Sequence, residues 1–461
     1  MCFHFPCIAS LVLTNIHLVF NINYTAIPDS VAFGDGEDDA FSLWSFEEFE
    51  DLADDWGDSS IIQSKHTSNM MKLLSSKSSR QYLSALSENN TAAFNMAILD
   101  AEPGDTVLVP DGHSFTLTGG LLAEEKHDIT IDFAGASHFA YDRTIWPFNI
   151  APRSISYQNF GSYDPGLTIY NSTNITVTSS SETLARVTVD YDKNMVYLVD
   201  SDTNRGGIIN GYGKQWWDDA ISGRLPDKQG DSRPRLVHVM ESGDIHIEKL
   251  TLLNSPFWTL TVEAVRAEIN NVNVLVDRRY QSALLQQKFE EAQSRNQPPQ
   301  LELQPPEFLR QERLLVEGDE VGQNLDIPFP IDELPDWVGR KLRQPEDLNT
   351  DGIDPIGQDI WIHHCIVQNA DDSIAVKPLK HRNVTDTRMP DCTRNVTIEH
   401  TVLTGFGASI GSVGPTPKHN CVDGITFHNI SMPGTGKGIY IKSDGSDCLR
   451  ENETAQITNI V

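Results

Sequence analysis

Short stretches of alternating apolar and polar residues recur along most of the chain, each introduced by turn residues. They read "HDITIDF" from 127, "STNITVT" from 172, "SGDIHIEKLTLLNS" from 242, "RAEINNVNVLV" from 266, "QDIWIHHCIVQNA" from 358, "RNVTIEHTVL" from 394 and "VDGITFHNISM" from 422. Alternation with period two predicts strands that bury one face. Aligned on Ile245, Ile269, Ile360, Val396 and Ile425, copies without a long insertion lie about 24 to 36 residues apart. Helical periodicity is almost absent between them, which disfavours a sheet with crossover helices.

A repeat of this size with two or three strands and no helix predicts an all-β solenoid, a parallel β-helix whose coils stack in register. A propeller is the alternative, but each of its blades needs four strands in about 40 to 45 residues. Before the first strands, Thr91 to Ala101 is expected to form a short capping helix. Such a helix would cover the open sheet edges at the start of the solenoid.

Two segments interrupt this pattern. Residues 27–88 are acidic and rich in serine, with scattered apolar residues, and predict a disordered linker or propeptide. The β-helix domain is expected at 89–461, with an insertion at about 280–346 that is rich in Gln, Glu, Leu and Pro and begins helically. That insertion is interpreted as a long surface excursion or as sequence retained by a faulty gene model.

The N-terminus contains an apolar run from Cys7 to Phe20 with the length of a signal-peptide core. It predicts a signal peptide over 1–26 and secretion, although no Lys or Arg precedes the run, so a buried or mis-annotated start is the alternative. No other stretch is long enough to span a bilayer, so no stable membrane insertion is expected after its removal. Glycosylation triplets compatible with secretion, each also ordinary turn composition, begin at Asn23, Asn89, Asn171, Asn174, Asn383, Asn395, Asn429 and Asn452.

Charge and composition narrow the partners. The 461 residues are 39% hydrophobic and carry a formal charge of −30 with a pI near 4.7. Such a composition is typical of a globular protein, and the charge excludes nucleic acid as a partner because a polyanion is repelled at long range. We expect a monomer working in an acidic extracellular environment.

Four cysteines would remain after loss of the signal peptide, with three possible pairings: Cys365, Cys392, Cys421 and Cys448. Cys392 and Cys421 each lie four residues before a strand-core residue, Val396 and Ile425. They are therefore candidates for stacking on adjacent coils within disulfide reach. Buried free thiols are the alternative.

The stretches "NTDGID" and "NADDSIAVK" contain the candidate chemistry, Asp351, Asp371 and Asp372. Adjacent aspartates conflict with strand alternation, so we expect a turn or bulge at 369–372 that brings both carboxylates to one groove. Asp351 lies about one coil earlier and would stack beside them. Glycoside hydrolysis needs a protonated carboxyl that donates to the leaving oxygen and an ionised one that activates water. A single aspartate here would more simply be a turn cap.

These segments, together with "GGIINGYGKQWWDD", "RPRLVHV", "TLLNSPFWTLTV", "GFGASIGS" and "IYIKS", resemble glycoside hydrolase family 28, the polygalacturonases and related pectin hydrolases. The resemblance implies a right-handed parallel β-helix that hydrolyses α-1,4-galacturonosyl links with inversion, without a metal or other cofactor. It implies that Asp371 is the general acid and that Asp351 and Asp372 hold and activate water. The implied partner is a pectin-like, acidic polysaccharide.

Two positions depart from the family pattern. Phe406 stands where the family has a histidine, and Tyr440 stands where it has an arginine that would bind a substrate carboxylate. Lys442 remains, and the expected substrate-binding residues are Asn349, Phe406, Tyr440 and Lys442. Nearby histidines do not occupy the missing position and are expected on the coil surface: His363, His364, His400, His419 and His428.

Three functions remain open at this stage. The first is a secreted inverting hydrolase, and the second is a catalytically impaired carbohydrate-binding β-helix, which the two aromatic replacements suggest. The third is a polysaccharide lyase, although lyases of this architecture want Ca²⁺ and a cationic base that does not stand out here. The ending "TAQITNIV" leaves a coil unfinished, which suggests truncation at the C-terminus.

Overall fold

The computed structural model describes residues 16–18, 77–149, 162–199, 201–225, 232–295, 348–379, 389–413, 421–443 and 456–461. Most of the predicted signal peptide, the linker up to residue 76, residues 296–347 of the insertion, His419 and Cys448 lie outside these residues. Two compact units are present, one of Met1–Val19 with Ser87–Val461 and one of Phe20–Leu86. Helix α3 (Lys77–Asp100) begins in the second unit, and all other elements described below belong to the first.

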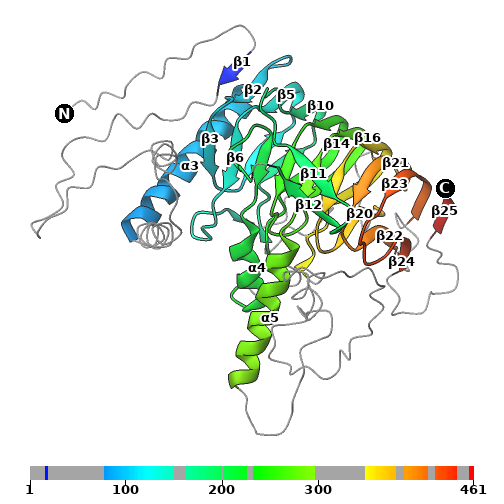
Figure 1. The fold of residues 1–461 in the computed structure, drawn as a ribbon. Helices are drawn as coiled ribbons and strands as arrows, with labels where there is room; N and C mark the ends of the chain where they lie inside the picture. Colours follow the sequence, from blue (N-terminus) through cyan, green and yellow to red (C-terminus); the bar gives the residue numbers. More distant parts are fainter. Residues whose placement is uncertain are drawn as a thin grey trace, which may run out of the picture. The chain divides into compact units, whose positions relative to one another are not determined.

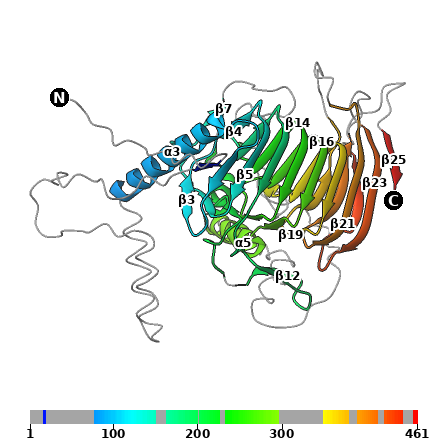
Figure 2. The ribbon, with the colours of Figure 1, turned by 90° about the horizontal axis from the view of Figure 1, so that it is seen from above.

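The strands of this unit join into a 21-stranded sheet that winds into stacked coils (Figures 1 and 2). All of its described strand pairs are parallel, so the predicted parallel β-helix is confirmed. A first ladder contains β4 (Leu121–Glu124), β9 (Leu167–Tyr170), β14 (Val237–Glu248), β16 (Leu260–Asn270), β18 (Ile353–His363), β20 (Asp372–Val376), β22 (Gly407–Val413) and β24 (Ile439–Ser443).

Two further ladders complete the coils. The second contains β1 (Ile16–Leu18), β2 (Thr106–Val109), β5 (His127–Phe133), β10 (Thr173–Thr178), the second halves of β14, β16 and β18, then β21 (Thr393–Leu403), β23 (Cys421–Ser431) and β25 (Gln456–Ile460). The third contains β3 (Ser114–Leu117), β6 (Ala136–Phe139), β13 (Ile208–Asn210), β15 (Thr251–Leu253), β17 (Asn273–Leu275), β19 (Ile366–Gln368) and the end of β21.

The remaining described elements lie outside the coils. Antiparallel pairs are formed by β7 (Phe148–Asn149) with β8 (Ser162–Tyr163) and by β11 (Val187–Asp190) with β12 (Met195–Leu198). The helices are α3 (Lys77–Asp100), α4 (Gly213–Ile221) and α5 (Arg278–Arg295). None of the described helices is both long and apolar enough to cross a membrane.

Ile269, one of the residues from which the repeat spacing was measured, pairs with neither Ile245 nor Ile360, and the offset is two residues on both sides. Ile245 pairs with Ala267, whereas Ile269 pairs with Ile247. Because strand side chains alternate with period two, a shift of two residues leaves the same face buried, and the apolar pattern does not distinguish the registers. The later alignment of Ile360, Val396 and Ile425 is confirmed.

The helix α3 covers the first coils and is longer than expected, since it begins at Lys77 rather than at Thr91. Its side chains satisfy backbone groups of the sheet edge. Asn90 Nδ2 donates to the Thr116 carbonyl at 3.0 Å, and Asn95 exchanges hydrogen bonds with the Gly120 carbonyl and the Leu122 N–H. Phe94 and Ile98 are fully buried in the core. The edge is therefore both paired and covered, as a solenoid end requires.

A column of left-handed residues marks the turn between the first and second ladders. Seven of these residues immediately precede a buried residue of the second ladder, at Asp128, Asn174, Asp244, Arg266, Asp359, Asn395 and Gly424, and an eighth, Asn459, precedes the exposed Ile460. Asparagine, aspartate and glycine tolerate positive φ best. Side chains also bond along the column, as from Asn395 Nδ2 to Asp359 Oδ1 at 2.6 Å.

The cysteine prediction is resolved for three of the four residues. Cys392 and Cys421 form a disulfide with a Cα–Cα distance of 5.0 Å, which joins adjacent coils. Cys365 is a buried free thiol. Both the expected pair and the alternative of a buried thiol therefore occur in the described residues.

Candidate active site

A bulge occurs at Ser373, directly after the two aspartates and one residue beyond the expected range of 369–372. Between β20 and β22, Asp372 pairs with Gly407 and Ile374 pairs with Ala408, so Ser373 is the extra residue. Asn369 stabilises the preceding turn because its Nδ2 donates to the carbonyls of Thr350 and Asp372, both at 2.8 Å. Ser373 Oγ donates back to Asn369 Oδ1 at 3.1 Å. A buried side-chain network therefore sets the backbone that carries Asp371 and Asp372.

Gly405 is required by this turn. A Cβ at Gly405 would lie 2.1 Å from Asn369 Oδ1 and 2.6 Å from the Asp371 carbonyl oxygen. Gly405 therefore allows the next coil to pack closely under the aspartates.

The Asp372 carboxylate is fully buried and accepts hydrogen bonds from the next two coils. Ser409 Oγ on β22 donates to Oδ2 at 2.7 Å. On β24, the Tyr440 hydroxyl donates to Oδ1 and Lys442 Nζ donates to Oδ2. Three donors, one of them charged, therefore converge on this carboxyl group and fix its orientation.

Asp351 lies beside these residues in a second charged group. Lys377 Nζ donates to Asp351 Oδ2 at 3.0 Å and lies 3.6 Å from Asp354 Oδ1. The same ammonium lies 4.4 Å from the centre of the Trp258 ring. Asp351 Oδ1 is buried and has no hydrogen-bond partner among the described residues. An unpaired buried carboxylate oxygen is costly, so this atom is suited to accept from a bound molecule.

The pKa of Asp371 is raised well above its ordinary value. Burial is the largest cause, and the negative charges of Asp351 and Asp372 raise it further, while Lys442 and the Asp372 N–H oppose the shift. Like charges and desolvation both disfavour the ionised form of a carboxyl group. Asp371 is thereby suited to hold a proton beside Asp351 and Asp372.

The sequence offers Asp354 as a second carboxylate of the "NTDGID" motif but assigns it no catalytic role. It is fully buried, and burial raises its pKa well above the ordinary value against the opposing charge of Lys377. In the structure Asp354 pairs with Thr261, which is also buried. A buried carboxyl group in an apolar strand needs a charged partner, and for Asp354 this partner is Lys377.

The side chains of Phe406 and Tyr440 are in contact across adjacent coils. The Phe406 and Tyr440 rings lie edge to face with centres 6.1 Å apart. Lys437 Nζ lies 4.8 Å from the centre of each ring, and its side chain is exposed. Burial and the hydrogen bond to Asp372 raise the pKa of the Tyr440 hydroxyl, so it remains a neutral donor. The sequence did not identify Lys437 as a site residue. Its ammonium group supplies a positive charge beside the neutral Tyr440.

The other expected residues lie as follows. Asn349 is exposed and has a left-handed backbone with φ 46, two residues before Asp351. Lys442 is partly exposed beside Asp372. His364, His400 and His428 lie on the coil surface as expected, but for His363 the expectation was wrong, because its ring is buried against Trp361.

The helix α5, which includes the start of the expected insertion, supports the segment that leads into Asp351. Leu284 and Leu285 pack in one apolar cluster with Leu348, and Gln281 Nε2 lies 3.4 Å from Thr350 Oγ1. Arg278 donates to the carbonyl of Thr404, the residue before Gly405. This helix is therefore part of the scaffold of the site.

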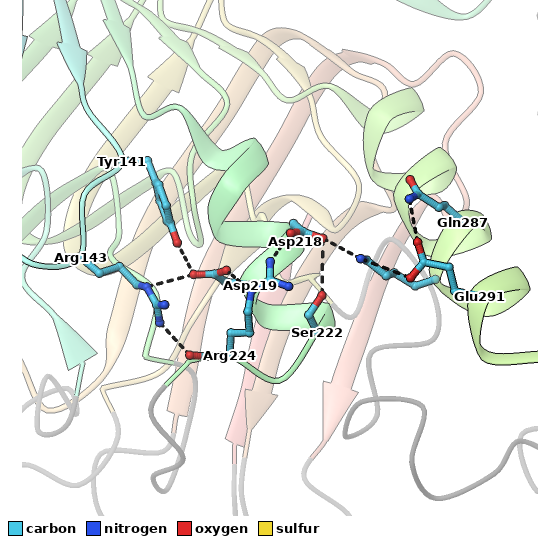
Figure 3. A network of polar contacts seen from close by, with 9 residues as sticks. Tyr141, Arg143, Asp218, Asp219, Ser222, Arg224, Gln287 and Glu291 are labelled. Atoms are coloured by element: carbon cyan, nitrogen blue, oxygen red, sulfur yellow. Dashed lines mark hydrogen bonds and ion pairs between the residues drawn. The ribbon is translucent and has the colours of Figure 1, made fainter. Parts of the chain in front are cut away.

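A polar network joins α5 to α4, and Figure 3 shows its side chains converging on the α4 carboxylates. Lys288 on α5 lies 3.2 Å from Asp218 Oδ1, and Arg224 bridges Asp218 and Asp219. Arg143 Nε lies 3.0 Å from the buried Asp219. The two aspartates of "WWDD" therefore form ion pairs that connect α4 to its neighbours.

The chain is similar to proteins of known family. The family model described as Glycosyl hydrolases family 28 matches residues 104–282 and 341–461. An endo-polygalacturonase of Pectobacterium carotovorum subsp. carotovorum is 39% identical over 100 residues, 21% of this chain and 22% of that protein. A probable polygalacturonase of Vitis vinifera is 43% identical over 58 residues, 13% of this chain and 11% of that protein. The aligned stretches span about a fifth or less of these curated relatives.

Two solved structures are similar to this chain. The endo-xylogalacturonan hydrolase from Aspergillus tubingensis aligns with a TM-score of 0.49 and 17% identity, covering 81% of this chain and 69% of its own. The polygalacturonase from Erwinia carotovora ssp. carotovora aligns with a TM-score of 0.43 and 18% identity, covering 80% and 73%.

Proposed function

Because the chain belongs to glycosyl hydrolases family 28, we propose that it hydrolyses galacturonosyl-type α-glycosidic links of pectin or a related acidic polysaccharide. The reaction proceeds with inversion and by acid and base catalysis alone. The observation that carries the proposal is the raised pKa of Asp371 beside two other buried aspartates. Glycoside hydrolysis requires a carboxyl group that keeps its proton until it donates it, with a second carboxyl group close by to activate water.

In this mechanism Asp371 donates its proton to the glycosidic oxygen as the bond to the anomeric carbon breaks. Asp351 and Asp372 bind the attacking water, and one of them accepts its proton. Asp351 Oδ1 is the acceptor assigned to that water. This atom is buried and has no hydrogen-bond partner among the described residues. Lys377 holds the other oxygen of the same carboxylate at 3.0 Å, which fixes its orientation.

Substrate carboxylates are bound by Lys442 and Lys437 in this proposal. Lys442 is partly exposed, and the exposed Lys437 ammonium stands over both aromatic rings. Phe406 and Tyr440 present an apolar face on which a sugar ring packs, and Asn349 offers an exposed amide. Since Tyr440 replaces a cation, we expect weaker recognition of plain polygalacturonate than of a substrate with fewer charges or with side chains.

The direct test is product analysis with the purified chain on polygalacturonate, rhamnogalacturonan and xylogalacturonan. Hydrolysis gives new reducing ends without absorbance from unsaturated sugars. Inversion of an α-link gives the β-anomer of the new reducing end, which the NMR spectrum shows before mutarotation. Unsaturated products would show a lyase instead. Reducing ends from none of the three substrates would overturn the hydrolase proposal for this substrate class.

Substitution of Asp371 tests its role as the acid. We expect Asp371→Asn to lower kcat by about 10²- to 10⁴-fold, because an amide cannot donate the proton. Asp423→Asn, which changes a surface carboxylate on β23, is the matched control and should retain full activity. Near-normal turnover of a folded Asp371→Asn variant would exclude this residue as the acid.

A carbohydrate-binding protein without turnover is the second candidate, and the Phe406–Tyr440 ring pair favours it. Aromatic rings bind sugars without any catalytic group. Binding of a pectin oligosaccharide with no cleavage after prolonged incubation would establish this alternative.

We also propose that the protein is secreted and acts as a monomer on the cell wall. The apolar run before Phe20, the Cys392–Cys421 disulfide and the glycosylation triplets support this location. Expression in a eukaryotic host with analysis of the medium, the N-terminus and the glycans would test it.

A further inference from the structure

A cluster of imidazole and carboxylate groups lies on the second ladder, on strands other than those that carry the candidate catalytic aspartates. It consists of Glu399 and His400 on β21 and His428 on β23, all exposed or partly exposed. One ligand atom from each residue lies within 4.8 Å of the other two. The proposed hydrolysis makes no use of these side chains.

The coil register creates this cluster. His363, Glu399 and His428 pair directly on three successive strands. The next residues, His364, His400 and Asn429, all have positive φ, at 54, 52 and 52. Since stacked strands lie about 4.8 Å apart, in-register side chains of neighbouring coils meet at a distance suited to a shared ligand.

The carboxylate of Glu399 is oriented by a partner outside the cluster. Trp361 Nε1 donates to Glu399 Oε1 at 2.8 Å. The other oxygen, Oε2, lies 3.5 Å from His428 Nδ1 and 4.0 Å from His400 Nε2. One oxygen and two ring nitrogens from different residues therefore converge, with the carboxylate fixed from behind as metal ligands usually are.

The His400 ring is also fixed on its far side. Its Nδ1 lies 2.7 Å from the side-chain amide of Asn429, and its ring stacks on that of His364 with centres 5.3 Å apart. Amide oxygen and nitrogen are assigned from the hydrogen-bond network. The Asn429 atom beside Nδ1 is the amide nitrogen Nδ2. A metal bound at Nε2 therefore requires the amide to turn by 180°, after which Nδ1–H donates to the amide oxygen and Nε2 carries the lone pair.

We propose that Glu399, His400 and His428 bind a Zn²⁺ ion that joins two adjacent coils of the β-helix. Two imidazoles and one carboxylate are a common zinc set, with water as the fourth ligand. Calcium and magnesium prefer oxygen ligands, so they do not fit this site. The three ligands meet only in the folded chain, because two strands contribute them, so the ion stabilises the fold. This role is separate from the hydrolysis.

Zinc binding is tested on chain produced without N-glycans, so that the Asn429 amide is unmodified, and stripped with EDTA. We expect Zn²⁺ to bind and to raise Tm, and Ca²⁺ to do neither. His400→Ala and His428→Ala should each lower Zn²⁺ affinity by at least about tenfold. His113→Ala, which removes an exposed histidine of the first coils, is the matched control and should bind as the unmodified chain does.

A second variant tests the site without removing a ligand. Trp361→Phe keeps an aromatic ring but deletes the donor to Glu399, and we expect about 10- to 100-fold weaker Zn²⁺ binding. Circular dichroism confirms that each variant is folded. The proposal is overturned if Zn²⁺ does not bind, if Ca²⁺ binds as tightly, or if the folded His400, His428 and Trp361 variants all keep full affinity.

Discussion

At the residue scale, the hydroxyl group of Tyr440 is a hydrogen-bond donor to the buried side chain of Asp372. This position therefore supplies the buried carboxyl group with a neutral donor. Sequence reasoning identified the loss of charge and did not identify this hydrogen bond. The strand register places Tyr440 on the same side of its coil as Ser409, which bonds the same carboxylate.

Restoring the family residue should separate charge from hydrogen bonding. We expect Tyr440→Arg to lower KM for polygalacturonate several-fold, because a cation returns to the groove. Tyr440→Phe should leave KM nearly unchanged and lower kcat, because a buried carboxylate loses one donor, at a cost of about 1–3 kcal/mol. Steady-state kinetics on polygalacturonate measures both. An unchanged kcat in Tyr440→Phe would show that the hydrogen bond has no part in turnover.

Asp354 gives a prediction about pH and stability. Its pKa is raised in the folded chain, so the stability that it contributes is present below its ordinary pKa and is lost as pH rises through the raised value. Asp354→Asn removes this loss. We therefore expect Tm of the variant to fall less between acidic and neutral pH than Tm of the unmodified chain. Parallel Tm profiles for the two proteins would contradict the assignment.

At the scale of elements, α5 is a structural part of the catalytic coil although it begins a segment read from sequence as an insertion. Its apolar face packs with Leu348, and Arg278 bonds the main chain beside Gly405. Weak helical periodicity made the helix foreseeable, but its packing partners lie far along the sequence.

Truncation of one buried leucine of α5 tests this support. We expect Leu285→Ala to lower the free energy of unfolding by about 2–5 kcal/mol, because it leaves a cavity between α5 and the segment before Asp351. Gln287→Ala on the exposed face of the same helix is the control and should change stability by no more than about 0.5 kcal/mol. Denaturant unfolding of both variants provides the comparison, and equal stabilities would contradict the packing role.

At the scale of the whole molecule, a formal charge of −30 repels a polyanionic substrate. Screening weakens this repulsion before it weakens contacts at Lys437 and Lys442, because the Debye length falls from about 30 Å at 0.01 M salt to about 8 Å at 0.15 M and about 3 Å at 1 M. We expect kcat/KM on polygalacturonate first to rise and then to fall with added salt. Lys437→Met should flatten the fall, and a steady decrease from the lowest salt would contradict long-range repulsion.

The sequence by itself determined the repeating coils, the asparagine and aspartate turns and the bulge at the paired aspartates. These features follow from local rules, since side-chain period, positive φ and turn chemistry act over a few neighbouring residues. The tertiary structure decided the register between Ile245 and Ala267, the partners of Asp372 and the contact of α5 with the site. It also decided which coil-surface histidines meet. Each of these depends on which coils lie side by side, and a pattern with period two is satisfied equally well by a neighbouring register.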